Sequence, residues 1–254
     1  MPDASNCNVI CLKWGTRYPA SFTNILYGSV KRNLSRPFRF VCVTDDPNGL
    51  HPEIEAVPLA PNPGYPYDRW PNIFMKLAVL QEGFAGLQGP TLFLDVDVVI
   101  LGQLDCFFDW NPGQNCIIHN WIEWHKTLFR ARPAVGNSSV FRFEAGPRGG
   151  ALYETFLREF DEANDPSLYP TEQAFLTHAM GKVSWWPEEW VCSFKRKCRP
   201  VFPLNLIVPP RRPLTKILVF HGAPDPDQAV EGFAGKKWHH RTLPAPWILD
   251  DWHE

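Results

Sequence analysis

The chain of 254 residues contains 44% hydrophobic and 20% charged residues, a balance that is typical of globular proteins and gives no reason to expect disorder. Its length is close to the upper limit for one hydrophobic core, so we expect a single α/β domain. A net charge of -2 lacks the basic surplus of a duplex-binding protein, and nucleic acid is therefore not an expected partner.

The cysteines and the hydropathy of the chain indicate its compartment. The seven cysteines are an odd number, and several lie within apolar runs, as buried thiols do. No apolar stretch approaches the ~20 residues of a membrane-spanning helix, and no secretory leader pattern opens the sequence. We therefore expect a cytoplasmic protein with reduced cysteines and no transmembrane segment.

The first part of the chain has a strand, helix, strand pattern. Strands are predicted at 8–12 and 38–44, and the apolar residues between them recur at helical spacing over 21–33. A short third strand is predicted at 54–58. The segment 58–72 that follows is rich in proline and aromatic residues, which indicates a structured loop over one face of the sheet.

The remaining elements extend this pattern. The strand at 91–94 is apolar except at its first residue, as a strand buried on both faces is expected to be. The other predicted elements are a helix at 72–80, strands at 116–119 and 138–143, helices at 152–160 and 171–180, and a strand at 216–220. This order predicts a mostly parallel central sheet flanked by helices. The tail at 236–254 has no strong periodicity.

Two carboxylates follow the most apolar strand directly. Asp95 and Asp97 are one residue apart and lie where the strand enters its loop, which is where open α/β sheets bind ligands. Alternation along extended backbone places both side chains on one side, so together they can bind a hard cation such as Mn²⁺ or Mg²⁺ through oxygen. A turn with capping aspartates is the alternative interpretation of the same residues.

Other polar positions also have a functional and a structural interpretation. His221 ends the last predicted strand and is either a third metal ligand or a packing residue. Lys76 either directs its ammonium group at a bound donor or lies in solvent. Glu172 and Gln173 open a helix, where an acidic residue also stabilises the helix dipole.

Several of these segments, in the same order along most of the chain, resemble motifs of the family 8 glycosyltransferases, which have the GT-A fold. The matching segments are Phe93-Leu94-Asp95-Val96-Asp97, the helix that carries Lys76, Asn137-Ser138-Ser139-Val140-Phe141, Glu172-Gln173-Ala174-Phe175-Leu176 and Val219-Phe220-His221-Gly222. The resemblance implies a GT-A-like, Rossmann-like single domain over 1–254. Its nucleotide-sugar-binding half is expected at 1–110, and its acceptor-side half with the C-terminal tail at 111–254.

The resemblance also implies an activity and a set of site residues. It implies a metal-dependent glycosyltransferase, with Mn²⁺ or Mg²⁺ as cofactor, that moves a sugar from a nucleotide sugar, expected to be a UDP-sugar, to a glycan or lipid-linked acceptor with retention of configuration. A role in polysaccharide biosynthesis follows by analogy alone. The implied metal ligands are Asp95, Asp97 and His221. The implied donor-binding residues are Lys13, Trp14, Gly15, Tyr18, Lys76, Asp95, Val96 and Gly222, and the implied catalytic residues are Glu172, Gln173 and Asn137.

The sequence departs from the family pattern at several positions, among them Ser139 in place of a glycine and Glu172 in place of an aspartate. After the first strand the family has an aspartate followed by an aromatic residue that binds the base, whereas this chain has Lys13-Trp14-Gly15-Thr16-Arg17-Tyr18. Glycine directly follows His221, and the family's phosphate-binding lysine has no matching position before Lys236. The base of the nucleotide and the lysine for its phosphates therefore stay open.

Three other classes of protein are alternatives. The segment around Asp95 and Asp97 also resembles the nucleophile strand of haloacid-dehalogenase-type phosphatases, although those enzymes carry that strand near the start of the domain and need a later acidic pair. A nucleotidyltransferase would have a glycine-rich phosphate loop after its first strand, to which Trp14-Gly15-Thr16-Arg17 is a poor match. A non-catalytic carbohydrate-binding protein is the third alternative, against which the intact Asp95, Asp97 and His221 argue.

The tail has two interpretations of its own. Its tryptophans and basic residues are those expected of a peripheral contact with the inner face of a membrane, but they are also consistent with a segment packed on the domain. The residues concerned are Trp238, Trp247, Trp252, Lys236, Lys237 and Arg241.

Overall fold

The computed structural model describes residues 7–59, 75–121, 134–163, 165 and 167–254. The proline-rich loop predicted at 58–72 lies almost entirely outside the described residues, as do the first residues of the helix predicted at 72–80. No helix in the described part of the chain has the length and hydropathy needed to cross a bilayer.

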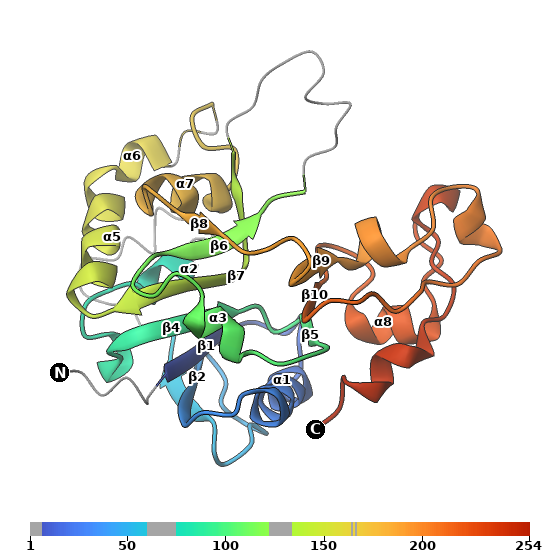
Figure 1. Ribbon diagram of the computed structural model, residues 1–254, viewed down its shortest axis with the longest axis horizontal. Coiled ribbons are helices and arrows are strands. Elements are labelled where there is room, and N and C mark those ends of the chain that lie inside the picture. The colour runs from blue at the N-terminus through green and yellow to red at the C-terminus, as the bar shows by residue number, and fades with distance from the viewer. Residues whose placement is uncertain (1–6, 60–74, 122–133, 164, 166) are drawn as a thin grey trace.

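A seven-stranded sheet forms the centre of the molecule, in the order β3-β2-β1-β4-β7-β6-β8 (Figure 1). Its strands are β1 (Cys7–Lys13), β2 (Phe38–Thr44), β3 (Glu55–Pro58), β4 (Gly89–Leu94), β6 (Cys116–His119), β7 (Gly136–Ala145) and β8 (Ser184–Trp185). All neighbouring strands are parallel except at β7, which is antiparallel to both β4 and β6. The prediction of a mostly parallel α/β sheet is therefore confirmed.

Helices cover both faces of this sheet. Figure 1 shows α1 on one side and α5, α6 and α7 on the other. The helices are α1 (Ala20–Asn33), α2 (Met75–Ala78), α3 (Asp105–Asp109), α5 (Pro147–Arg158), α6 (Phe160–Ala163) and α7 (Glu172–Ala179), with a short 3-10 turn at Phe84–Gly86. Strand residues alternate between the two cores, since Leu92 and Leu94 pack with α1 while Phe93 between them packs with α5. This double burial explains why the sequence of β4 is apolar almost throughout.

The C-terminal part forms a smaller lobe around a second sheet, shown in orange and red in Figure 1. Its strands are β5 (Val99–Ile100), β9 (Val191–Ser193) and β10 (Ile217–Val219), in the order β5-β10-β9, with β9 and β10 parallel. The helical elements of the lobe are a π-helix at Phe194–Cys198, α8 (Pro226–Glu231) and short turns at Leu204–Leu206, Trp238–His240 and Pro246–Asp250. The strand predicted at 216–220 therefore belongs to this lobe and not to the central sheet.

Candidate active site

The pairing of β4 with β7 brings two of the sequence motifs together. Leu94 lies opposite Val140 in antiparallel register, and the backbone NH of Asp95 donates to the carbonyl of Ser139 over 2.9 Å. The motif that begins at Asn137 therefore lies beside the two aspartates. The Asn137 side-chain oxygen accepts from the backbone NH of Ser139 over 3.0 Å, so this side chain shapes its own strand end.

A partly buried polar network extends from Asp95 to α7. The Lys76 ammonium forms an ion pair with Asp95 over 2.7 Å and donates to the Ser138 hydroxyl over 3.3 Å, and that hydroxyl donates to Glu172. Burial alone would lower the pKa of Lys76, but Asp95 and Glu172 outweigh it and the pKa is raised. Burial is also the largest cause of a raised pKa at Glu172, whose side chain is 2% exposed. Ser138 and Glu172 are buried in this network, whereas the side chains of Lys76 and Asp95 are 15% and 23% exposed.

Glu172 is placed by a cap that another residue provides. Thr171 is the N-cap of α7, and its side chain accepts from the backbone NH of Ala174 over 3.3 Å. Because Thr171 caps the helix, the carboxylate of Glu172 is available to the site, where it accepts from Ser138. The side-chain oxygen of Gln173 is buried without a hydrogen-bond partner among the described residues. A buried acceptor of this kind is open to a ligand donor.

Asp97 lies in a different environment from Asp95. It is 9% exposed, and burial followed by the charge of Asp95 raises its pKa to about 7. The Tyr18 hydroxyl lies 2.9 Å from Asp97 and 3.2 Å from Asp225, and Arg17 pairs with Asp225 over 2.9 Å. Tyr18 therefore links the end of β4 to the first residues of α8 in the C-terminal lobe.

His221 follows β10 and lies among cations. Its ring stacks on Trp121 with the centroids 5.7 Å apart, and the Ser193 hydroxyl is 3.4 Å from its ring nitrogens. The Lys195 ammonium donates to the backbone carbonyl of His221. Burial, and then Lys195 with two neighbouring arginines, lowers the pKa of His221 to about 4. The imidazole is therefore neutral at physiological pH, as a metal ligand must be.

The three predicted metal ligands are not gathered into one cluster. Among the described residues, no group of three or more His, Cys, Asp or Glu side chains is close enough together to hold a metal ion. Asp95 and Asp97 nevertheless fit a hard cation, because both offer oxygen and Asp97 has no ion pair within the described part of the chain. Metal binding at these residues stays a prediction.

The remaining predicted donor-binding residues surround the end of β1. Lys13 is buried and donates to the carbonyl of Asp46 over 3.3 Å, whereas Trp14 is exposed. The backbone NH of Gly15 donates to Asp45 over 2.9 Å, and its positive φ of 63° suits glycine. The side chain of Val96 packs in the core beside α1, so a donor would meet its backbone and not its side chain.

Gly222 lies against the cations beside His221. A Cβ atom on this residue would be 3.3 Å from the Lys195 ammonium, and its φ is also 63°. A larger side chain would therefore be strained here and would crowd Lys195.

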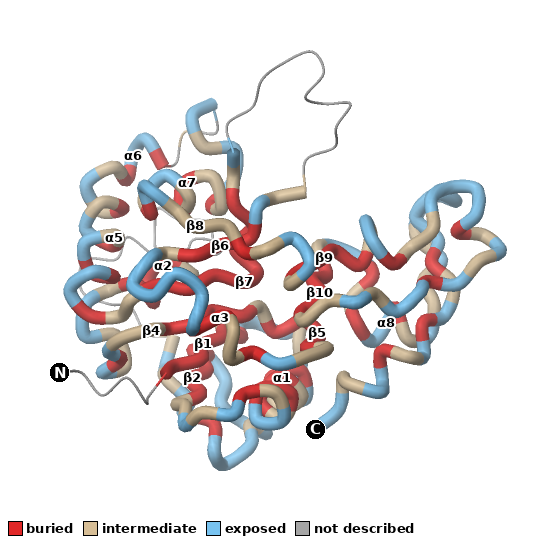
Figure 2. The backbone as a smooth tube through the Cα atoms, in the orientation of Figure 1, coloured by how far each residue is buried: buried red, intermediate tan, exposed pale blue. Residues whose placement is uncertain are grey.

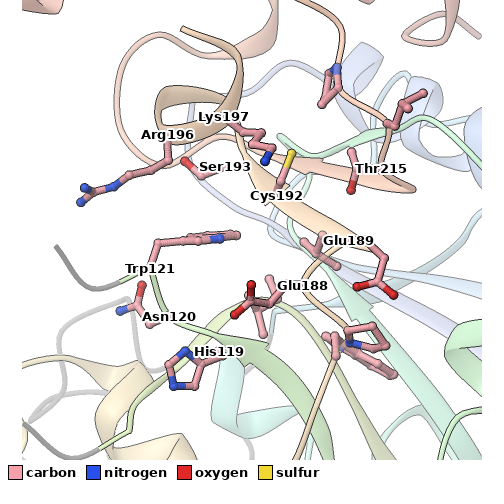
Figure 3. Close-up of a pocket in the computed structure, with 16 residues that line it drawn as sticks. His119, Asn120, Trp121, Glu188, Glu189, Cys192, Ser193, Arg196, Lys197 and Thr215 are labelled. Carbon is pink, nitrogen blue, oxygen red and sulfur yellow. The ribbon is translucent and has the colours of Figure 1, made fainter. Parts of the chain in front are cut away.

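A pocket of about 730 Å³ lies next to His221, between the central sheet and the C-terminal lobe. Trp121 and Ser193, which contact His221, both line it. Figure 3 shows the indole of Trp121 above Glu188, with Glu189 and Thr215 on the opposite side. Aromatic faces combined with carboxylates and hydroxyls provide apolar surface and hydrogen-bond acceptors in one cavity.

Residues of the site that were not predicted from the sequence include Ser138, Ser193, Lys195 and Asp225. Asp225 and Lys195 lie in loops or beside very short strands, and Ser193 ends the three-residue strand β9. Parallel pairing of Ser193 with Val219 brings the ends of β9 and β10 together. This contact joins residues far apart in the chain. The one local signal is that basic residues follow β9 directly, at Lys195, Arg196 and Lys197.

Comparison with known proteins identifies the fold. No protein-family model and no curated protein sequence matches the chain. The structure is similar to that of the galactosyltransferase LgtC in complex with donor and acceptor sugar analogues, with a TM-score of 0.58, 12% identity and coverage of 86% of this chain and 88% of that one. The chain therefore has the GT-A fold of these glycosyltransferases, as the sequence predicts.

Two longer proteins share this fold. The bifunctional glycosyltransferase WbbM, in its apo structure, matches with a TM-score of 0.58 and 14% identity over 89% of this chain and 47% of that one. The glycosyltransferase GlyE of Streptococcus pneumoniae TIGR4 matches with a TM-score of 0.54 and 13% identity over 86% of this chain and 56% of that one. At these identities the similarity concerns the fold and not the substrate.

Proposed function

We propose that the protein is a metal-dependent glycosyltransferase that moves a sugar from a nucleotide sugar, with UDP as the expected nucleotide, to a glycan or glycolipid acceptor with retention of configuration. The observation that carries this proposal is the partly buried network of Lys76, Asp95, Ser138 and Glu172 beside Asp97, at the end of a buried strand. In a GT-A fold this edge of the sheet is where a donor is expected.

The charges of the site suit a nucleotide diphosphate and a cation together. Asp95 and Asp97 would hold Mn²⁺ or Mg²⁺, whereas His221, the third expected ligand, does not form one cluster with them among the described residues. When bound, the cation neutralises the diphosphate and favours its departure as the glycosidic bond breaks. Lys195 is the residue that we propose for the phosphate oxygens, because its ammonium lies beside Gly222 and the motif after His221 has no lysine at the family position.

The residues near α7 would act on the sugar. The charge of Glu172 would stabilise positive charge that develops at the anomeric carbon, and Gln173 would accept from a sugar hydroxyl with its unpaired oxygen. Asn137 would contact the same sugar from the end of β7. The pocket beside Trp121 would take the acceptor, because it opens next to His221.

The setting of the reaction is part of the proposal. All seven cysteines are described and all are free thiols, which supports a reducing compartment, and we propose the cytoplasm. The phosphatase alternative is disfavoured, because its nucleophile strand comes near the start of its domain, whereas Asp95 here follows the fourth strand of the chain and the fold is that of glycosyltransferases.

The test is release of the free nucleotide from a panel of nucleotide sugars. We expect UDP release from at least one UDP-sugar with Mn²⁺, abolished by a chelator and in Asp97→Asn. Phosphate release from simple esters without any nucleotide release would instead assign the protein to the phosphatases. Release that is unchanged by chelation would contradict the metal-dependent mechanism.

A further inference from the structure

The segment between Glu189 and Asp225 has an unusual charge composition. Its 35 residues contain no aspartate or glutamate, although the chain as a whole has 27 of them and a net charge of -2. The basic residues of the segment are Lys195, Arg196, Lys197, Arg199, Arg211, Arg212 and Lys216. Arg212 is paired with Asp251 over 2.7 Å. The lobe that contains this segment is therefore a basic region on a slightly acidic protein.

Large apolar side chains are exposed on the same segment. Single exposed apolar residues are ordinary, but a group of them marks a contact surface. The side chains of this segment that are at least half exposed are Val201, Phe202, Leu204, Ile207 and Leu214, and Trp238, further along the chain in the same lobe, is also largely exposed. They make up most of the large hydrophobic residues that are exposed in the described part of the chain.

Hydrogen bonds bring two parts of this surface together. Asn205 is buried and donates to the backbone carbonyls of Trp238 and Arg241 over 3.0 Å and 2.9 Å. The segment 201–207 is thereby fixed against 238–241, so Trp238 lies beside the exposed residues around Leu204. Lys236, Lys237 and Arg241 are exposed on the same turn. We call 201–207 with 236–241 the apolar-basic face. Figure 2 shows the outer end of the lobe as largely exposed.

The tail tryptophans do not all belong to this face. Trp247 donates its indole NH to the carbonyl of Pro210 over 3.0 Å, and Trp252 packs edge-on against Phe22 with centroids 5.0 Å apart. Both residues pack against the core of the lobe. Of the three tail tryptophans considered for a membrane contact, Trp238 alone is largely exposed.

We propose that the apolar-basic face binds the surface of a bilayer that contains anionic lipids. Apolar side chains in a fixed turn can insert between headgroups, while lysine and arginine around them attract lipid phosphates. This combination of charge and exposed apolar surface fits an anionic bilayer better than a polyanion, because a polyanion gains nothing from Phe202, Ile207 and Trp238.

The basic segment also extends to the pocket beside Trp121, where Arg196, Lys197 and Leu214 line it. A lipid-linked acceptor would suit an enzyme that is docked on a membrane. This consequence rests on the proposed function, whereas membrane binding by the face does not.

The test is flotation of the purified protein with vesicles of equal parts phosphatidylglycerol and phosphatidylcholine, and with vesicles of phosphatidylcholine alone. We expect binding to the anionic vesicles only. The double variant Phe202→Ser/Ile207→Ser should bind about ten-fold or more weakly, since each side chain loses its apolar burial. Lys236→Glu/Lys237→Glu should weaken binding by at least about five-fold for each position.

Matched controls use exposed residues elsewhere on the domain. Leu168→Ser and Lys182→Glu change the same kinds of side chain away from the face and should leave binding unchanged. All substituted residues are exposed, so thermal melting should stay as in the wild type. Equal binding to both vesicle types, no binding at all, or loss in the charge variant without loss in the apolar variant would each overturn the proposal. Nucleotide release is measured separately, on protein whose donor site is unchanged. The membrane proposal and the proposed function can therefore fail independently of each other.

Discussion

The ends of β4 and β10 carry opposite charges. At the end of β4 the side chains are acidic, and burial raises the pKa of Asp97 to about 7. At the end of β10 the neighbours are basic, and burial with those cations lowers the pKa of His221 to about 4. Each region is therefore short of the charge that the other has in excess. A metal ion would supply positive charge to the end of β4, and a diphosphate would supply negative charge to the end of β10. The contrast between the two regions therefore indicates the kind of ligand.

Among the described residues, Tyr18 provides the polar link between these two regions. Its hydroxyl contacts Asp97 on one side and Asp225 on the other, and Asp225 pairs with Arg17. Burial and then Arg199 lower the pKa of Lys195, and the charge of Asp225 opposes this shift only in part. The predictions below first remove charges from the acidic region, then from the basic region, and finally break the link.

The largest effect is expected from the two aspartates. Asp95→Asn and Asp97→Asn should each lower nucleotide release by about a thousand-fold, since metal coordination contributes several kcal/mol to catalysis. The measurement is the rate of UDP release at saturating Mn²⁺. Asp227→Asn, at an exposed position of α8, is the matched control and should be unchanged. Activity retained in both aspartate variants would place the reaction elsewhere.

Glu172 should affect activity and stability in opposite directions. Glu172→Gln should lower turnover by about a hundred-fold through loss of a charge near the sugar. The raised pKa means that the folded protein holds this proton to higher pH than the unfolded chain, so its contribution to stability is lost as pH rises through the raised pKa. Glu172→Gln has no carboxyl group that titrates at this position, so its stability does not fall in this way as pH rises.

The check for Glu172 is a urea titration of both proteins at several pH values. The wild type should lose stability relative to Glu172→Gln on going from acidic to neutral pH. A variant that is much less stable at neutral pH would show a structural role instead, because the amide would then fail to replace a carboxylate that stabilises the fold.

A smaller effect is expected in the basic region. Lys195→Met should raise the dissociation constant of UDP by about ten-fold, the usual effect of losing one hydrogen bond to a charged group. Lys216→Met, directly before β10, removes a similar charge from the same lobe and should leave UDP binding unchanged. Equal weakening by both variants would mean that general charge and not a specific contact attracts the nucleotide.

The smallest effect is expected from breaking the link. Asp225→Asn removes the charge that pairs with Arg17 but keeps a residue that caps α8, so the helix should stay intact. We expect about 1 kcal/mol or less of lost local stability, measured as faster hydrogen exchange around β10 and α8. Unchanged exchange would show that packing alone holds the lobe against the sheet.

The central sheet and the acidic region could be predicted from sequence because their signals are local. The apolar runs of β1, β2 and β4 and the periodic α1 are long enough to be recognised, and Asp95 and Asp97 follow one of them directly. The gathering of Lys76, Ser138 and Glu172 around Asp95 depends on the β4 and β7 register, which the structure shows and the sequence did not predict.

The basic region could not be predicted in this way. Strands β5, β8 and β9 have two or three residues each, too few for a periodic pattern. Lys195 reaches His221 through the pairing of β9 with β10, which no local sequence pattern encodes. The phosphate role that we propose for Lys195 therefore rests on the structure and not on a sequence motif.

Calorimetric titration of UDP tests the central claim that a metal and a diphosphate together complete the site. The account predicts binding with Mn²⁺, loss of binding with a chelator, and loss in Asp97→Asn even when Mn²⁺ is present. Binding of UDP that is equally strong with the chelator, or unchanged in Asp97→Asn, would contradict it.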